Sequence, residues 1–160
     1  MVTGSRRGLI VPRGFDAFGD APVVLVEGPS DTAACIGVGL DVLGRPSNVG
    51  GVDLLTRALQ RRKGAVIVLG ERDFRDDDRA PHGWRWPGLE GAMRTASAMS
   101  RALGRHVYAS IPPAPHKDAR DWLQREPSMT PDKAVDTLLG ISRELLPMRH
   151  RHTRTTETTR

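Results

Sequence analysis

The sequence has one cysteine, few aromatic residues and no long apolar run, and each absence excludes a class of protein. The lone Cys35 allows no intrachain disulfide and no cysteine-rich zinc site. Aromatic residues make up 4% of the chain, so aliphatic side chains must supply most of the core. No apolar stretch approaches the ~20 residues of a membrane span, and residues 1–8 lack the apolar core of a signal peptide. We therefore expect a cytoplasmic protein without a membrane partner.

Positive charge is concentrated near the carboxyl terminus. The 160-residue chain has a net charge of +5, and residues 148–160 hold four arginines against one glutamate, which supplies more than half of it. The remaining body is nearly balanced, so charge alone supports a nucleic-acid partner only weakly. The length fits one domain. We expect a lead-in over residues 1–20, a single folded domain over residues 21–147 and a disordered basic tail over residues 148–160.

Strand and helix signals alternate along the folded region. Short runs rich in Val, Ile and Leu predict strands at residues 23–26, 65–69 and 107–111, with a further short strand near residues 47–49. Amphipathic segments predict helices at residues 31–43, 52–62, 88–103, 119–126 and 131–146. The expected N-caps of the first and last helices are Ser30 and Thr130. Because the strands are too apolar to have a solvated face, the expected fold class is α/β, a mostly parallel sheet of about four strands with helices on both faces.

Acidic residues follow two of the buried strands at the point where each strand ends. Glu27 follows the first strand, and Glu71 and Asp73 follow the strand at residues 65–69. Because the carboxyl ends of parallel strands meet at one edge of a sheet, we expect these carboxylates to lie close together. Carboxylate oxygens are the ligands that Mg²⁺ prefers, and like charges held together repel unless a cation neutralises them. The pattern predicts a Mg²⁺ site, with Mn²⁺ as the alternative ion.

Other polar and aromatic residues in these segments have structural explanations too. Asp31 lies near the start of a helix, where its carboxylate can simply interact favourably with the helix dipole. The acidic run at residues 76–78 can be a solvated loop. Trp84 and Trp86 can stack on unpaired bases or pack over the sheet, and packing is the interpretation we favour. Two histidines in proline-rich loops are assigned to the surface rather than to a metal: His82 and His116.

Three short motifs, in this order, resemble those of the topoisomerase/primase (Toprim) domain. VLVEGPSD at residues 24–31 is similar to the first motif, a strand followed by Glu-Gly and a later acid. VIVLGERD at residues 66–73 is similar to the second motif, which normally reads Asp-x-Asp. KDARDWL at residues 117–123 is similar to a stretch near the end of primase-type Toprim domains. The resemblance covers residues 22–124, and it departs from the family at Glu71 and in a longer segment over residues 74–87.

The resemblance implies a Toprim-like, Rossmann-like fold and a primase-like function, namely Mg²⁺-dependent phosphoryl or nucleotidyl transfer on nucleic acid in DNA replication. It implies that Glu27 is a catalytic acid/base or metal ligand, and that Glu71 and Asp73 coordinate Mg²⁺. The residues that would line the same site are Asp31, Lys117, Asp118 and Asp121. The implied partners are single-stranded DNA or RNA, nucleotides, and other replication or mobile-element proteins.

Two rival functions remain open at this point. Nucleases with Toprim modules use the same acids to cleave phosphodiesters, and a non-catalytic module would keep the fold to bind nucleic acid or protein. The chain has no Gly-x-x-x-x-Gly-Lys phosphate loop, and its one tyrosine, Tyr108, lies in a predicted strand, which argues against an ATPase and a topoisomerase. The zinc-binding and flanking parts of a complete bacterial-type primase do not fit in this length, so we expect a lone module or a fragment.

Overall fold

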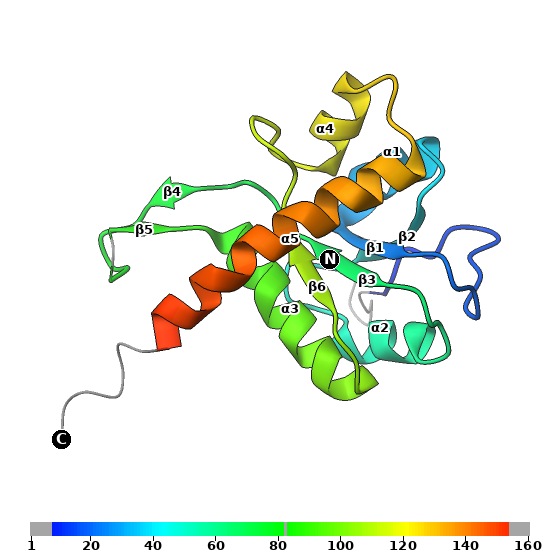
Figure 1. The fold of residues 1–160 in the computed structure, drawn as a ribbon, viewed down its shortest axis with the longest axis horizontal. Helices are drawn as coiled ribbons and strands as arrows, with labels where there is room; N and C mark the ends of the chain where they lie inside the picture. Colours follow the sequence, from blue (N-terminus) through cyan, green and yellow to red (C-terminus); the bar gives the residue numbers. More distant parts are fainter. Residues whose placement is uncertain (1–7, 82, 154–160) are drawn as a thin grey trace, which may run out of the picture.

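The structure is a computed structural model that describes residues 8–81 and 83–153. Its main sheet (Figure 1) is made of β1 (Val23–Glu27), β2 (Asp41–Arg45), β3 (Val66–Leu69) and β6 (Tyr108–Ser110). A separate two-stranded hairpin is made of β4 (Arg75–Asp76) and β5 (Trp84–Arg85). The helices are α1 (Gly28–Gly37), α2 (Val52–Leu59), α3 (Pro87–Leu103), α4 (Ala119–Arg125) and α5 (Pro131–Thr153).

The main sheet is parallel throughout and has the strand order β2-β1-β3-β6. Val24 and Val26 of β1 pack in a core cluster with residues of α1, α4 and α5, whereas Val23 and Leu25 pack in a second cluster with α2 and α3. Successive residues of a strand point to opposite faces, so β1 is buried on both sides and has no polar alternation. The expected α/β class, with a parallel four-stranded sheet between two helix layers, is confirmed, and the architecture is Rossmann-like.

The first half of the sheet differs from the prediction. The helix expected at residues 31–43 is wrong, because α1 already ends at Gly37 and β2 occupies Asp41–Arg45. Gly39, at a φ of 82°, turns the chain into that strand, a conformation that glycine adopts without strain. No strand forms at residues 47–49. Ser30 is not the N-cap either, since α1 begins at Gly28 and Glu27 is the capping residue, without a side-chain bond.

The later elements agree more closely with the pattern. Thr130 accepts a hydrogen bond from the Lys133 backbone N–H at 3.3 Å, as expected of an N-cap. Tyr108 lies in β6 and packs against the core, as expected. Helix α5 runs to Thr153, beyond the predicted end near residue 146 and into the segment predicted as a disordered tail; residues 154–160 of that tail lie outside the described residues.

Residues 8–20 lie against the domain. Ile10 forms an antiparallel bridge with Gly44 of β2, and Phe15 packs against the α2 and α3 side of the core. The buried Arg62 side chain donates hydrogen bonds to the Asp16 and Ala21 carbonyls and pairs with Asp41 at 2.6 Å. Most of the predicted lead-in is therefore part of the folded unit. No helix in the described part of the chain is both long and apolar enough to span a membrane.

Two glycines let the end of β3 touch the start of α3. A Cβ atom added to Gly70 would meet the Gly88 carbonyl, and one added to Gly88 would meet the Glu71 backbone N and O and lie 2.9 Å from Asp73 Oδ1. Backbone therefore packs directly on backbone at this point. The contact fixes where Glu71 and Asp73 leave the sheet.

We predict that Gly88→Ala destabilises the domain by more than about 2 kcal/mol, because the added methyl group has only backbone to displace. The matched control is Gly140→Ala in α5, where an added Cβ has nothing within 4 Å and alanine should be neutral or stabilise the helix by up to about 1 kcal/mol. Urea denaturation of both variants measures the difference. Equal stability of Gly88→Ala and wild type would show that the contact is looser than described.

Candidate functional site

The tips of β1 and β3 meet at one edge of the sheet. The two strands are parallel neighbours, with Leu25 level with Val68, and Glu27 at the end of β1 lies two residues beyond that pair. Glu71 follows Gly70 directly, and Asp73 lies two residues further on. The parallel pairing of β1 with β3 therefore brings the segments that carry Glu27, Glu71 and Asp73 to the same edge of the sheet.

Glu71 is the centre of this acidic edge. Partial burial raises the pKa of its carboxyl group, and the nearby charges of Glu27, Asp118 and Asp73 raise this pKa further. Lys117 opposes them, with its Nζ 3.9 Å from Glu71 Oε2. Carboxylates from β1, from the segment after β3 and from the start of α4 thus share one electrostatic environment. Such a cluster of like charge is typical of sites that bind a cation.

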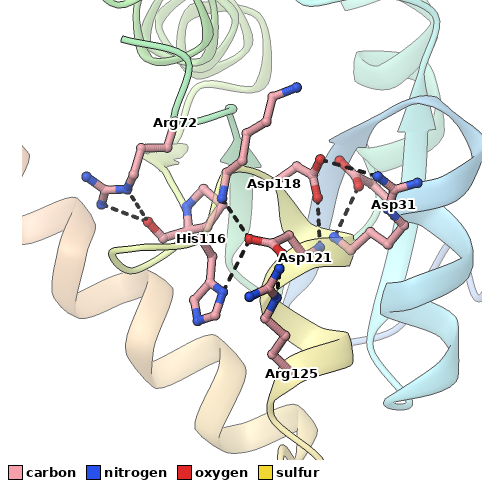
Figure 2. A network of polar contacts seen from close by, with 9 residues as sticks. Asp31, Arg72, His116, Asp118, Asp121 and Arg125 are labelled. Carbon is pink, nitrogen blue, oxygen red and sulfur yellow. Dashed lines mark hydrogen bonds and ion pairs between the residues drawn. The ribbon is translucent and has the colours of Figure 1, made fainter.

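Asp31 contributes a buried carboxylate from α1. Its side chain is 6% exposed and accepts a hydrogen bond from the Arg120 backbone N–H at 3.1 Å, which ties α1 to α4 (Figure 2). Burial raises its pKa to about 6, and the charges of Asp118 and Glu71 add to the shift. A carboxylate that faced only the dipole of its own helix would not be buried against a second helix, so helix-dipole stabilisation does not account for this residue by itself.

Two of the predicted site residues have clear structural roles as hydrogen-bond acceptors at helix starts. Asp73 Oδ1 accepts from the Gly88 N–H at 2.7 Å in the first turn of α3. Asp118 is the N-cap of α4 and accepts from the Asp121 N–H at 2.7 Å. Each of these carboxylates keeps a second oxygen, so a structural role does not prevent a further contact.

Asp121 points into a different set of contacts (Figure 2). It accepts from the Lys117 N–H at 3.2 Å and pairs with Arg125 Nε at 2.7 Å, and His116 Nδ1 lies 3.4 Å away. The pKa of Asp121 is lowered mainly by the hydrogen bond from the Lys117 backbone, and to a smaller extent by the charges of Arg125 and His116. We therefore assign Asp121 to bracing the loop before α4. The surface assignment of His116 is wrong, because this residue is only 8% exposed; His82 lies outside the described residues.

The acids share an edge without forming a ready coordination shell. Within residues 8–81 and 83–153, no group of three or more His, Cys, Asp or Glu side chains is placed to hold a metal ion. The donor set, carboxylate oxygens alone, matches the preference of Mg²⁺ for hard ligands. A metal ion would need these side chains to rotate toward one another.

Arg45 is a further residue of this edge that the sequence analysis missed. It ends β2 level with Glu27, is 1% exposed, and donates to the Asn48 carbonyl at 2.5 Å and to the Leu69 carbonyl at 2.9 Å. Burial lowers its pKa, whereas the charges of Glu27 and Glu71 raise it. A buried guanidinium therefore lies under the acidic edge as a fixed positive charge. The sequence feature that could have identified Arg45 is a charged residue directly after a short apolar run. This feature was missed because the run was assigned to a helix.

We predict that Asp31→Asn stabilises the domain at pH 8 by up to about 3 kcal/mol, because asparagine keeps the acceptor for Arg120 and removes a buried charge. A raised carboxyl pKa means that the folded state binds the proton more tightly than the unfolded state. Wild type should therefore lose stability as the pH rises from about 4 through about 6, and the variant should not. Urea denaturation across this pH range, without divalent ions, measures the effect.

The matched control is Asp20→Asn, at an exposed aspartate outside the acidic edge. Its stability should follow the pH profile of wild type. A constant difference between Asp31→Asn and wild type from pH 4 to pH 8 would contradict the assignment of a raised pKa to Asp31.

We also predict that Arg45→Met raises the pKa of Glu71 beyond its wild-type value, because a buried positive charge that interacts with Glu71 is removed. The loss of donors to two carbonyls should cost about 1–3 kcal/mol in stability. Arg45→Lys keeps the charge, so it should retain the wild-type Glu71 titration. Carboxyl NMR titration measures this pKa, and an identical Glu71 titration in Arg45→Met and wild type would rule out the electrostatic role.

Comparisons of this chain with protein-family models, with curated proteins and with solved structures find no match. The fold and the geometry of the acidic edge are therefore the observations from which a function must be argued.

Proposed function

We propose that this chain is a primase-like Toprim domain that binds Mg²⁺ at its acidic edge and supports phosphoryl or nucleotidyl transfer on nucleic acid. The observation that carries the proposal is the juxtaposition of Glu27, at the end of β1, with Glu71, just beyond the end of the neighbouring parallel strand β3. Open parallel sheets bind their ligands beyond the carboxyl ends of the strands. The three motifs named above meet at this edge, which supports the resemblance on which the family assignment rests.

Electrostatics favours a cation at this edge. The charges of Glu27, Asp73 and Asp118 all act on Glu71, and desolvation makes its ionised form still less favourable. A divalent cation would relieve both costs at once, because it would attract every ionised carboxylate nearby. Glu27, Glu71 and Asp73 are the residues that would hold it. When bound, Mg²⁺ would orient phosphate oxygens and stabilise the negative charge that develops on them.

The remaining residues of the edge have complementary roles in the proposal. Lys117 has a side chain that is 65% exposed and contacts Glu71 only at 3.9 Å, so it is free to turn toward a substrate phosphate. Buried Arg45 is too enclosed to touch substrate, and it limits the repulsion between Glu27 and Glu71. Asp31, with its pKa of about 6, can hold or release a proton near neutral pH beside these acids.

The second candidate function is a non-catalytic binding module, and a specific observation favours it. Asp73 and Asp118 already serve as acceptors at the starts of α3 and α4, and the described side chains form no ready metal-binding group. In this alternative, the acidic residues serve to stabilise the fold rather than to bind a metal ion. The nuclease alternative uses the same edge and differs only in the reaction catalysed.

We predict that wild type binds Mg²⁺ and that Asp73→Asn binds it more weakly without unfolding, because asparagine still accepts from Gly88 but carries no charge. Glu27→Gln should abolish turnover; retained metal binding in that variant would assign Glu27 to proton transfer rather than to coordination. Calorimetry measures binding, and labelled DNA with Mg²⁺ and nucleotides reports the reaction. Primer synthesis supports the primase-like function, whereas strand shortening supports a nuclease.

The matched control is Glu144→Gln, at an exposed glutamate of α5. It should bind Mg²⁺ and turn over as wild type does. Calorimetry that shows equal Mg²⁺ affinity for wild type and Asp73→Asn would remove Asp73 from the metal site. Absence of Mg²⁺ binding in wild type would contradict the proposed Mg²⁺-dependent function and support the non-catalytic binding module.

A further inference from the structure

The hairpin of β4 and β5 carries exposed aromatic rings next to the acidic edge. The Phe74 ring lies 5.4 Å from the Trp84 ring, centroid to centroid, at an interplanar angle of 33°. The two residues are 55% and 40% exposed. In a chain with so few aromatic residues, two neighbouring rings that face solvent are unusual and need an explanation. We call this pair, Phe74 and Trp84, the stacking face.

A third ring anchors the stacking face to the domain. Trp86 meets Phe74 edge-on, with centroids 6.2 Å apart, and packs against the small core cluster of Leu89, Ile111 and Leu145. The Arg72 guanidinium lies 5.3 Å above the Trp86 ring and is held by two hydrogen bonds to the Pro112 carbonyl. The packing over the sheet expected of the tryptophans thus describes Trp86, whereas Trp84 packs on the Phe74 ring and stays 40% exposed.

The hairpin is joined directly to the acidic edge. Phe74 follows Asp73 in sequence, and Asp73 in turn bonds to Gly88 at the start of α3, so the two ends of the segment are held together. Figure 1 shows β4 and β5 extending away from the main sheet on the side of α3. The stacking face is therefore attached directly beside the proposed metal-binding acids.

The charge of the hairpin indicates which part of a polymer it contacts. Residues 72–86 contain four arginines and four aspartates, so the segment is neutral with histidine uncharged. Arg85 is occupied by Glu90 at 2.6 Å, whereas Arg75 and Arg79 are exposed and form no ion pair with the described residues. A neutral surface cannot bind a polyanion mainly through phosphates. Flat aromatic rings suit stacking on unpaired bases, and the two guanidinium groups of Arg75 and Arg79 can add a small number of phosphate contacts.

We propose that the stacking face binds the bases of single-stranded nucleic acid and guides the strand to the acidic edge. This inference rests on the proposed function, because it names the form of the polymer on which that edge acts. A duplex fits poorly, since its base faces are already covered by neighbouring base pairs. Stacking is tolerant of sequence, so little preference among bases is expected.

The test measures binding of a labelled oligonucleotide of about 12 deoxythymidines, and of its duplex, by fluorescence anisotropy in EDTA. Wild type should bind the single strand more tightly than the duplex. Phe74→Leu and Trp84→Leu keep an apolar side chain and lose the ring, and each should weaken binding about tenfold. The matched control is Phe18→Leu, at an aromatic residue that is 62% exposed in the amino-terminal segment, and it should bind as wild type does.

Salt and metal separate this inference from its alternatives. With Arg75 and Arg79 of the hairpin and Lys117 of the acidic edge available to meet phosphates, the logarithm of the affinity should fall with the logarithm of salt concentration with a slope no steeper than about −2.1. Equal binding by wild type and both leucine variants would overturn the proposal, as would a preference for duplex. EDTA removes Mg²⁺, so the binding assay does not depend on the metal site. If wild type binds the single strand but calorimetry detects no Mg²⁺ binding, the proposed catalytic function is wrong and the stacking proposal is supported.

Discussion

The parallel pairing of β1 with β3 is the constraint on which the candidate site depends. Because side chains at the ends of neighbouring parallel strands emerge at one edge, the register that sets Leu25 level with Val68 also brings Glu27 to the edge from which Gly70 and Glu71 leave the sheet. The register is in turn fixed by burial, since a shift by one residue would exchange the sets of valines that face the two helix layers. The acidic edge is therefore a consequence of how the core packs.

Two buried residues of opposite charge, Asp31 and Arg45, lie near this edge. Asp31 is buried with a raised pKa and retains a single backbone donor, which destabilises the fold at neutral pH. Arg45 is buried with two carbonyl acceptors and offsets part of the negative charge from below. A domain selected only for stability would replace both residues with apolar ones. Their presence beside Glu27 and Glu71 favours a site whose charge is used, since perturbed groups gather where proteins act on ligands.

The sequence allowed the class of fold and the main acids to be predicted, because both depend on short patterns. A short β-branched run bounded by a glycine, such as residues 65–69, favours a buried strand, and an acid directly after such a strand lies at the edge of the sheet. Strand β2 was missed because Asp41–Arg45 follows a helix after a turn of few residues and contains a glycine, which weakens its strand signal. Arg45 was missed with it. The burial of His116 and the helix-start bonds of Asp73 depend on contacts between distant segments, which no local pattern contains.

The segment between β3 and α3 is anchored to the domain at both of its ends. Its ends are held where Gly70 and Gly88 pack backbone on backbone and where Asp73 bonds to Gly88, so its length is not constrained by the sheet. Trp86 and Arg72 fix its base on the domain, and this anchoring limits the entropy that the outer rings would lose on meeting a ligand. In the proposed function, an aromatic surface next to a cluster of carboxylates would combine two chemistries, contact with the faces of bases and contact with phosphate through a cation. Unpaired nucleic acid is the polymer that presents both.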